Sequence, residues 1–154
     1  LAWSNKLARI ISIALTVVII AFFLSNGFYK MPPNRLINQT EKVADFVIEK
    51  SDGKEFNFAL ITDRNSDHAY KYFLDIKGYK PTELDTLVTE QLIAVCESEK
   101  CAPLGHPIWE IAGFGPTAII VDQWIIPDIG ITVFKLSHDP NLPSPAGKPA
   151  VKGQ

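Results

Sequence analysis

The polar residues best suited to chemistry gather in one short stretch after a predicted strand. Residues 63–68 read Asp-Arg-Asn-Ser-Asp-His. Asp63, Asp67 and His68 could hold a metal ion, or His68 could act as a general base, with the amide of Asn65 beside them. The same residue types also form a turn that caps a helix, because their side chains bond to nearby backbone N–H groups. The capping turn is the simpler interpretation, and a ligand site is the alternative.

A second candidate lies in residues 101–115. His106 and Glu110 are four residues apart and would share one face of a helix, while Trp109 could lie against a sugar ring. A metal or catalytic pair would need further ligands, such as His68. An ordered loop whose aromatic residues enter the core is therefore the simpler interpretation. We predict no catalytic residue, no metal and no cofactor, and we name these residues as candidate ligand-binding positions: Asp63, Asn65, Asp67, His68, His106, Trp109 and Glu110.

The N-terminal segment is apolar for long enough to cross a membrane. Residues 10–24 carry no charge, and the run extended to Tyr29 reaches about 20 residues, the length that a spanning helix needs. Lys6 and Arg9 precede it, which predicts that this flank lies in the cytoplasm and the rest of the chain outside, although Lys30 and Arg35 follow closely on the other side. A cleaved signal peptide is the alternative, because Ser-Asn-Gly at 25–27 resembles a cleavage site. We expect the lipid bilayer as a partner.

The two cysteines, Cys96 and Cys101, are separated by four residues at the end of a predicted strand. Such a pair can close a short loop as a disulfide, which suits a domain outside the cytoplasm. Free thiols are the first alternative. A zinc site is the second, but it needs four ligands and the nearest additional candidate is His106.

Charge is distributed unevenly along the chain. Residues 1–30 contain three basic side chains and no acidic one, so residues 31–154 carry 12 basic against 17 acidic residues, a net charge of −5. A domain of this charge is poorly suited to neutralise phosphates, and we predict that it binds no nucleic acid.

Apolar periodicity predicts an α/β fold. Helices are expected within 38–50 and 67–76, with one helical turn near 108–111. Strands are expected at 56–62, 92–96, 118–126 and 129–136, the last two joined by a hairpin at Pro127-Asp128. The fold class is thus a transmembrane helix followed by a small α/β sandwich with a mostly parallel sheet and a C-terminal β-hairpin. The expected boundaries are residues 1–30 for the membrane helix, 31–37 for a linker, 38–138 for the domain and 139–154 for a disordered tail.

Residues 65–70 and 96–115 resemble the C-terminal region of bacterial polytopic membrane glycosyltransferases, in the protein O-mannosyltransferase and aminoarabinose-transferase superfamily. The resemblance covers most of residues 1–138 and implies a last transmembrane helix followed by an extracytoplasmic domain. In that superfamily the catalytic acidic residues lie in the first extracytoplasmic loop of the full protein, and no position here matches them. The resemblance therefore implies a non-catalytic part of a lipid-phosphosugar-dependent transferase, with the parent's upstream transmembrane helices as further partners.

Three functions compete on the sequence alone. The first is this non-catalytic extracytoplasmic domain, favoured by a first residue other than Met, which suggests a fragment. The second is a stand-alone single-pass membrane protein whose domain binds a ligand or an envelope partner. The third is a small hydrolase or metal enzyme that uses Asp63, Asp67, His68 and His106, and it requires these side chains to converge in one pocket.

Overall fold

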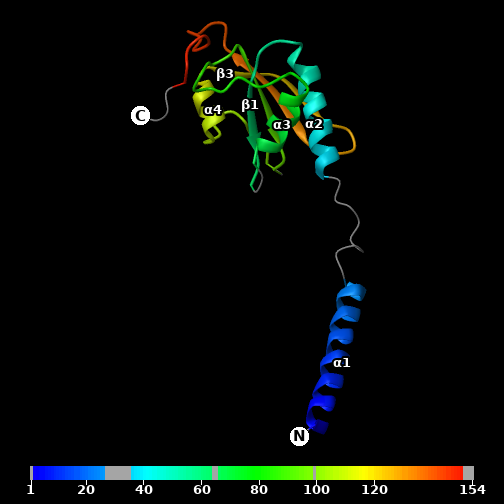
Figure 1. The fold of residues 1–154 in the computed structure, drawn as a ribbon. Coiled ribbons are helices and arrows are strands. Elements are labelled where there is room, and N and C mark those ends of the chain that lie inside the picture. The colour runs from blue at the N-terminus through cyan, green and yellow to red at the C-terminus, as the bar shows by residue number, and fades with distance from the viewer. Residues whose placement is uncertain (1, 27–35, 64–65, 99, 151–154) are drawn as a thin grey trace. The chain divides into compact units, whose positions relative to one another are not determined.

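The structure is a computed structural model that describes residues 2–26, 36–63, 66–98 and 100–150. The chain divides into two compact units, Leu1–Arg35 and Leu36–Gln154, which are described separately. Figure 1 shows the helix of the first unit and the mixed helices and strands of the second.

The first unit contains helix α1 (Ala2–Asn26). Its segment Lys6–Ser25 has a mean hydropathy of 2.6, and none of that segment is buried. A soluble helix would show a polar face, whereas the apolar side chains here surround the helix. The predicted apolar N-terminal helix is confirmed, with the length and composition of a membrane span or a signal sequence.

The second unit is a mixed four-stranded sheet with helices on its faces. Strands β1 and β2 are parallel, whereas β4 runs antiparallel to both β2 and β3. The strand order is β1-β2-β4-β3, so β1 and β3 form the edges. The elements in chain order are α2 (Leu36–Ser51), β1 (Asn57–Ile61), α3 (His68–Ile76), β2 (Gln91–Cys96), α4 (Trp109–Phe114), β3 (Ala118–Ile125) and β4 (Thr132–His138).

The α/β class and the C-terminal hairpin are confirmed, but the prediction of a mostly parallel sheet is wrong. The turn between β3 and β4 is short, and Asp128 and Gly130 within it both have positive φ, 67° and 74°. A connection of this length can join only antiparallel neighbours. Because β4 also pairs antiparallel with β2, a single parallel pair remains, β1 with β2.

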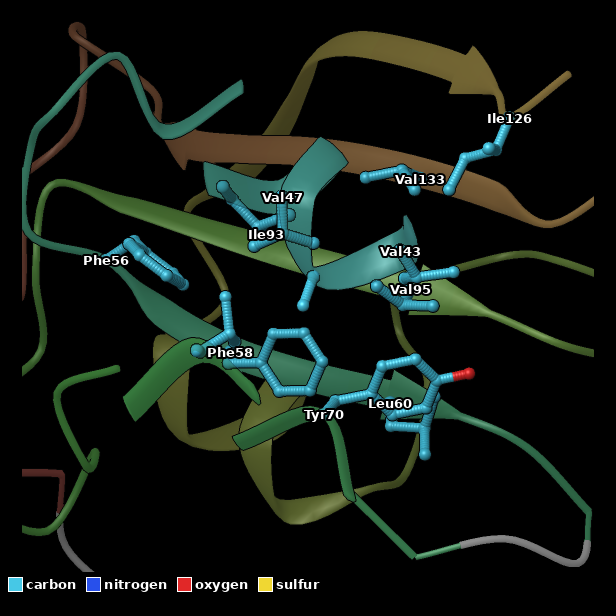
Figure 2. Close-up of a cluster of buried hydrophobic side chains, with 12 residues drawn as sticks. Val43, Val47, Phe56, Phe58, Leu60, Tyr70, Ile93, Val95, Ile126 and Val133 are labelled. Carbon is cyan, nitrogen blue, oxygen red and sulfur yellow. The ribbon is translucent and has the colours of Figure 1, made fainter. Parts of the chain in front are cut away.

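Strands β1 and β2 are buried at every position, which explains why each is apolar after its first residue. Helices α2 and α3 cover one face, where Val47 and Tyr70 pack over Phe58 and Ile93 (Figure 2). Helix α4 covers the other face, where Phe114 packs with strand residues that include Leu92, Phe134 and Leu136.

Helix α3 buries only some of its apolar side chains. Tyr70 and Leu74 are buried, whereas Tyr72 and Ile76 are 61% and 59% exposed. Residues four apart share a helix face, so burial of Tyr70 selects Leu74 and directs Tyr72 and Ile76 outward together.

Two predicted boundaries also move. Helix α2 begins at Leu36, so the end of the predicted linker is helical. The predicted disordered tail is instead held on the domain as far as Ala150, whose backbone N–H donates to the Leu84 carbonyl at 2.7 Å. Val88 N–H donates to the Lys148 carbonyl, and Gly147 N–H donates to the Val88 carbonyl. Backbone pairing needs no large side chains, so composition alone did not indicate it. Residues 151–154 lie outside the described residues.

Candidate functional site

The carboxyl ends of β1 and β2 bring together polar side chains that are far apart in sequence. Ile61 pairs with Cys96 at the end of the parallel ladder, which places the next residues, Thr62 and Glu97, side by side. The Glu97 N–H donates to the Ile61 carbonyl at 2.9 Å, extending the pairing by one residue. Thr62 Oγ1 donates to Glu97 Oε2 at 3.0 Å, and the Tyr70 hydroxyl donates to Glu97 Oε1. One carboxylate therefore joins both strand ends to helix α3.

The Tyr70 hydroxyl is fixed as a hydrogen-bond donor. Burial raises the pKa of Tyr70 well above its usual range, and the hydrogen bond to Glu97 and the charge of Glu97 raise it further. A phenol in this setting keeps its proton at physiological pH. It can orient a carboxylate or a ligand, but it is unsuited to act as a base or a nucleophile.

A groove of about 260 Å³ opens beside this cluster, between the start of α2 and α3. Tyr70, Glu97, Thr40 and Ser66 give it hydrogen-bonding groups, and apolar side chains, among them Phe73, line the rest. Convergent polar groups in an apolar hollow are the usual composition of a small-molecule site. The location also fits, because ligands of open α/β sheets bind beyond the carboxyl ends of the strands.

Most of the predicted residues in 63–68 lie outside this groove. His68 has a side chain 89% exposed, with its Nδ1 3.7 Å from Asp67 Oδ1. Asp67 Oδ2 is 2.8 Å from Lys71 Nζ, which also contacts Glu83 at 3.0 Å. Burial lowers the pKa of Lys71, but hydrogen bonds to Asp67 and Glu83 outweigh it and raise this pKa. The Asp67 carboxylate is therefore already paired with the Lys71 ammonium of the same domain.

The capping prediction is only partly right. Asp67 occupies the N-cap position of α3, but its side chain makes no capping hydrogen bond. Ser66 Oγ instead accepts from the His68 N–H at 3.3 Å. Asp63 is exposed, and Asn65 lies outside the described residues.

The predicted helix α4 exists, but His106 and Glu110 do not share a face of it. The helix begins at Trp109, so His106 lies before it, and its Nδ1 accepts from the Ile108 N–H at 3.4 Å. His106 lines a groove of about 470 Å³, whereas Trp109 and Glu110 line a different, water-sized pocket of about 20 Å³.

These positions bear on the metal-enzyme hypothesis. Within residues 2–26, 36–63, 66–98 and 100–150, no group of three His, Cys, Asp or Glu side chains could hold a metal ion. None of the grooves described above contains both His68 and His106. The convergence that this hypothesis needs does not occur among the described residues.

The predicted cysteine pairing is confirmed. Cys96 and Cys101 are at disulfide-bonding distance, with their Cα atoms 5.9 Å apart. The bond closes the short loop that starts directly after β2 and contains Glu97. The disulfide therefore restrains the backbone on one side of the carboxylate that joins Thr62 to Tyr70.

Thr62, Tyr70 and Glu97 were not predicted as a group from the sequence. Their positions in the sequence could have indicated the group, because Thr62 and Glu97 each directly follow an apolar strand. A single parallel register between those strands would have placed them together.

Sequence reasoning also passed over a buried histidine, His138. Its ring stacks on Phe114 with centroids 4.2 Å apart, and its Nε2 is 3.1 Å from the Thr89 carbonyl. A carbonyl oxygen only accepts, so Nε2 carries the hydrogen, and Nδ1 accepts from the Thr117 hydroxyl at 3.4 Å. With both nitrogens bonded inside the protein, His138 serves the fold.

Comparison of this chain with protein-family models, with curated proteins and with solved structures gives no match. Its function must therefore be argued from the site and from the order of its parts. Two features carry that argument: the apolar helix ahead of a disulfide-containing domain, and the groove at Tyr70 and Glu97.

Proposed function

We propose that this chain is a membrane-anchored domain that works outside the cytoplasm. It serves as a non-catalytic, ligand-binding part of a lipid-phosphosugar-dependent glycosyltransferase. The observation that carries the proposal is the pairing of Cys96 with Cys101 in a domain that follows an apolar helix. Disulfides persist in oxidising compartments and are rare in the cytosol. The basic residues ahead of the helix, Lys6 and Arg9, favour the same orientation.

The groove supports a polyhydroxylated ligand. Glu97 offers carboxylate oxygens to hydroxyl donors, and Thr40 and Ser66 add groups that both donate and accept. Phe73 and the neighbouring apolar side chains provide a surface for the C–H face of a sugar ring. The resemblance of residues 65–70 and 96–115 to membrane glycosyltransferases points to the same ligand class, a saccharide on the acceptor or the lipid-linked donor.

The orientation is tested by labelling single introduced cysteines with a membrane-impermeant maleimide in intact bacterial cells. Asn141→Cys lies on the exposed surface of the domain, and Ser4→Cys lies ahead of the apolar segment. We expect Asn141→Cys to react in intact cells and Ser4→Cys to react only after permeabilisation. The reverse pattern would place the domain in the cytoplasm. A mature product shortened by the N-terminal segment would show a cleaved signal peptide and would refute anchoring.

Ligand binding is tested by saturation-transfer difference NMR of methyl α-mannoside with the full chain in lipid nanodiscs. We expect saturation transfer to the sugar, and weaker transfer with Glu97→Gln, which keeps the shape of the side chain but removes its charge. Glu90→Gln makes the same chemical change at an exposed position outside the groove and should leave the signal unchanged. Equal signals from both variants would refute the groove as the sugar site.

A stand-alone single-pass protein that binds a ligand or an envelope partner is the second candidate. The observation that favours it is that Tyr70, Glu97 and Thr62, all within this one domain, are joined by hydrogen bonds beside the groove. The upstream coding sequence separates the two candidates. Further apolar spans in the same reading frame support the transferase part, and a start codon close to Leu1 supports the stand-alone protein.

A further inference from the structure

Strand β3 has an open edge. It lies at the end of the sheet and pairs with β4 on one side. Within the described part of the chain, no backbone hydrogen bond joins Ile119–Ile125 to any segment on the other side. A row of unpaired N–H and C=O groups is a template for another strand.

An apolar groove borders this edge on the α4 face of the sheet. It has a volume of about 470 Å³ and runs from Leu104 and Ile111 to Ala118, the first residue of β3. Ile120 pairs with Leu136, which belongs to the core under α4, so Ile120 lies on this same face. Ile120 and Ile125 remain 39% and 64% exposed. Alternate side chains of an added strand point to this face, where Ile120, Ile125 and the groove offer apolar contacts.

The opposite face of β3 carries a negative charge. Asp122 pairs in register with Lys135 of β4, but the Lys135 Nζ is 2.6 Å from Asp52 Oδ2 and also donates to the Lys50 carbonyl. This hydrogen bond to Lys135 lowers the pKa of Asp52. Asp122 is exposed and has no salt bridge among the described residues. It is available to a cation on an incoming strand.

We propose that the outer edge of β3 accepts a strand from a partner protein, a segment in which apolar and basic side chains alternate. The partner's backbone completes the ladder, its apolar side chains lie against Ile120 and the groove, and a basic side chain faces Asp122. Such strand addition obtains affinity from main-chain hydrogen bonds and specificity from alternate side chains.

A second copy of the chain suits this edge less well. Symmetric antiparallel pairing centred on β3 would bring Asp122 of each copy close together, and like charges opposite one another are destabilising. The ladder irregularity between Ile120 and Asp122 would occur in both partners and further disturb their pairing. A basic partner strand avoids the repulsion between two Asp122 side chains. A partner strand without a β-bulge avoids having an irregularity in both paired strands.

The test measures fluorescence anisotropy of labelled peptides with the full chain in phosphatidylcholine nanodiscs, using empty nanodiscs as blanks. The probe is a capped octapeptide of alternating Lys and Val, and the matched control alternates Glu and Val. We expect the Lys peptide to bind more tightly. N-methylation of every second residue of the Lys peptide removes donors to the ladder and should weaken binding by at least about tenfold.

Charge reversal sharpens the assignment. Asp122→Lys should weaken the Lys peptide by about threefold and strengthen the Glu peptide, because the pair is exposed and contributes modestly. Asp85→Lys changes net charge equally at an exposed position away from β3 and should leave the difference between the peptides unchanged. Equal affinity for the N-methylated peptide, or no response to Asp122→Lys, would overturn the proposal. Sedimentation that shows a dimer unable to bind the peptide would assign the edge to a second copy instead.

Discussion

The two ends of the parallel pair β1–β2 both carry polar clusters, but the clusters differ in what they leave accessible. At the amino end, Asn57 donates to the carbonyls of Thr82 and Leu87 and accepts from Thr89 N–H at 2.8 Å. Gln91 donates to the Ser51 carbonyl from the same end. Asn57 and Ser51 are fully buried, and Thr89 and Gln91 are each 5% exposed.

At the carboxyl end, the cluster of Thr62, Tyr70 and Glu97 borders a groove, and Glu97 is only half-buried. The polar side chains at the amino end mostly form hydrogen bonds to backbone groups of the neighbouring loops, so their role is to stabilise the fold. The carboxyl-end groups bond to one another around a carboxylate that borders open space. The contrast teaches that a polar cluster becomes a candidate site through its accessibility rather than through its residue types.

We expect the largest loss of stability from a substitution in the polar cluster at the amino end of β1 and β2. Asn57→Ala leaves two partly buried carbonyls and one buried N–H without their partner, so we expect the free energy of unfolding to fall by about 3 kcal/mol. Urea denaturation of the variant measures it. Asn38→Ala, at an exposed position of α2, is the control and should change stability little. A loss below about 1 kcal/mol would contradict the view that this cluster holds the fold.

The next effect loosens the carboxyl end. Replacing both cysteines with alanine removes the short closed loop between Cys96 and Cys101, and loop-closure entropy predicts a loss of about 2 kcal/mol. Thermal melts of the oxidised protein, the reduced protein and the double variant measure it. The reduced protein and the double variant should melt at similar temperatures, below the oxidised protein. Equal melting of all three would show that the bond does not constrain the domain.

A third prediction sharpens the comparison through pH. The folded state raises the pKa of Tyr70, so above about pH 10 the unfolded chain releases a proton that the folded chain keeps, and stability falls as pH rises. Tyr70→Phe should cost about 1 kcal/mol at neutral pH and should lack this component of the alkaline decline. Denaturation between pH 8 and about 11 measures the difference from the unmodified protein.

The stability of Tyr70→Phe must be compared with that of the unmodified protein at each pH, because Lys71 also has a raised pKa and its contribution to stability also falls as pH rises. That contribution is common to both proteins and cancels in the difference. Tyr72→Phe, at an exposed position of the same helix, is the matched control. A parallel decline in Tyr70→Phe and the unmodified protein would show that Tyr70 is not the responsible group.

The smallest expected effect lies away from both ends. Lys71→Gln removes the ion pairs to Asp67 and Glu83, which are partly exposed, so we expect a loss of about 0.5 kcal/mol or less. Measurements in 0.05 M and about 0.5 M salt should show the loss shrinking with screening. An effect that salt leaves unchanged would indicate that the Lys71 side chain contributes by packing.

Local sequence patterns predicted the helices and strands well, because secondary structure depends strongly on the residues within a few positions of each other. Apolar runs predicted strands at 56–62 and 92–96, which the structure has at Asn57–Ile61 and Gln91–Cys96, and Pro127-Asp128 marked the hairpin. The short cysteine spacing marked the disulfide. The pattern did not indicate which face of α3 is buried, because Tyr72 and Ile76 are apolar yet exposed.

The candidate site could not be read in the same way. Residues 63–68 were chosen because they are rich in polar groups, yet Asp67 pairs with Lys71 and His68 extends into solvent. Glu97 was passed over because a single glutamate after a strand carries no pattern. Its partners Thr62 and Tyr70 are 35 and 27 positions away; the sheet register brings Thr62 to Glu97, and the packing of α3 on the sheet brings Tyr70.

Hydrophobicity and spacing over a few residues were enough to predict the apolar N-terminal helix and the positions of the strands, and to make the disulfide the simplest interpretation of the two cysteines. The mixed strand order, the ordered tail up to Ala150 and the contact of Thr62 and Tyr70 with Glu97 emerge only from the folded chain. These depend on which backbone groups pair across the sheet and its loops. Which distant segments pair depends on the free energy of the whole core, and no single segment contains enough sequence information to predict it.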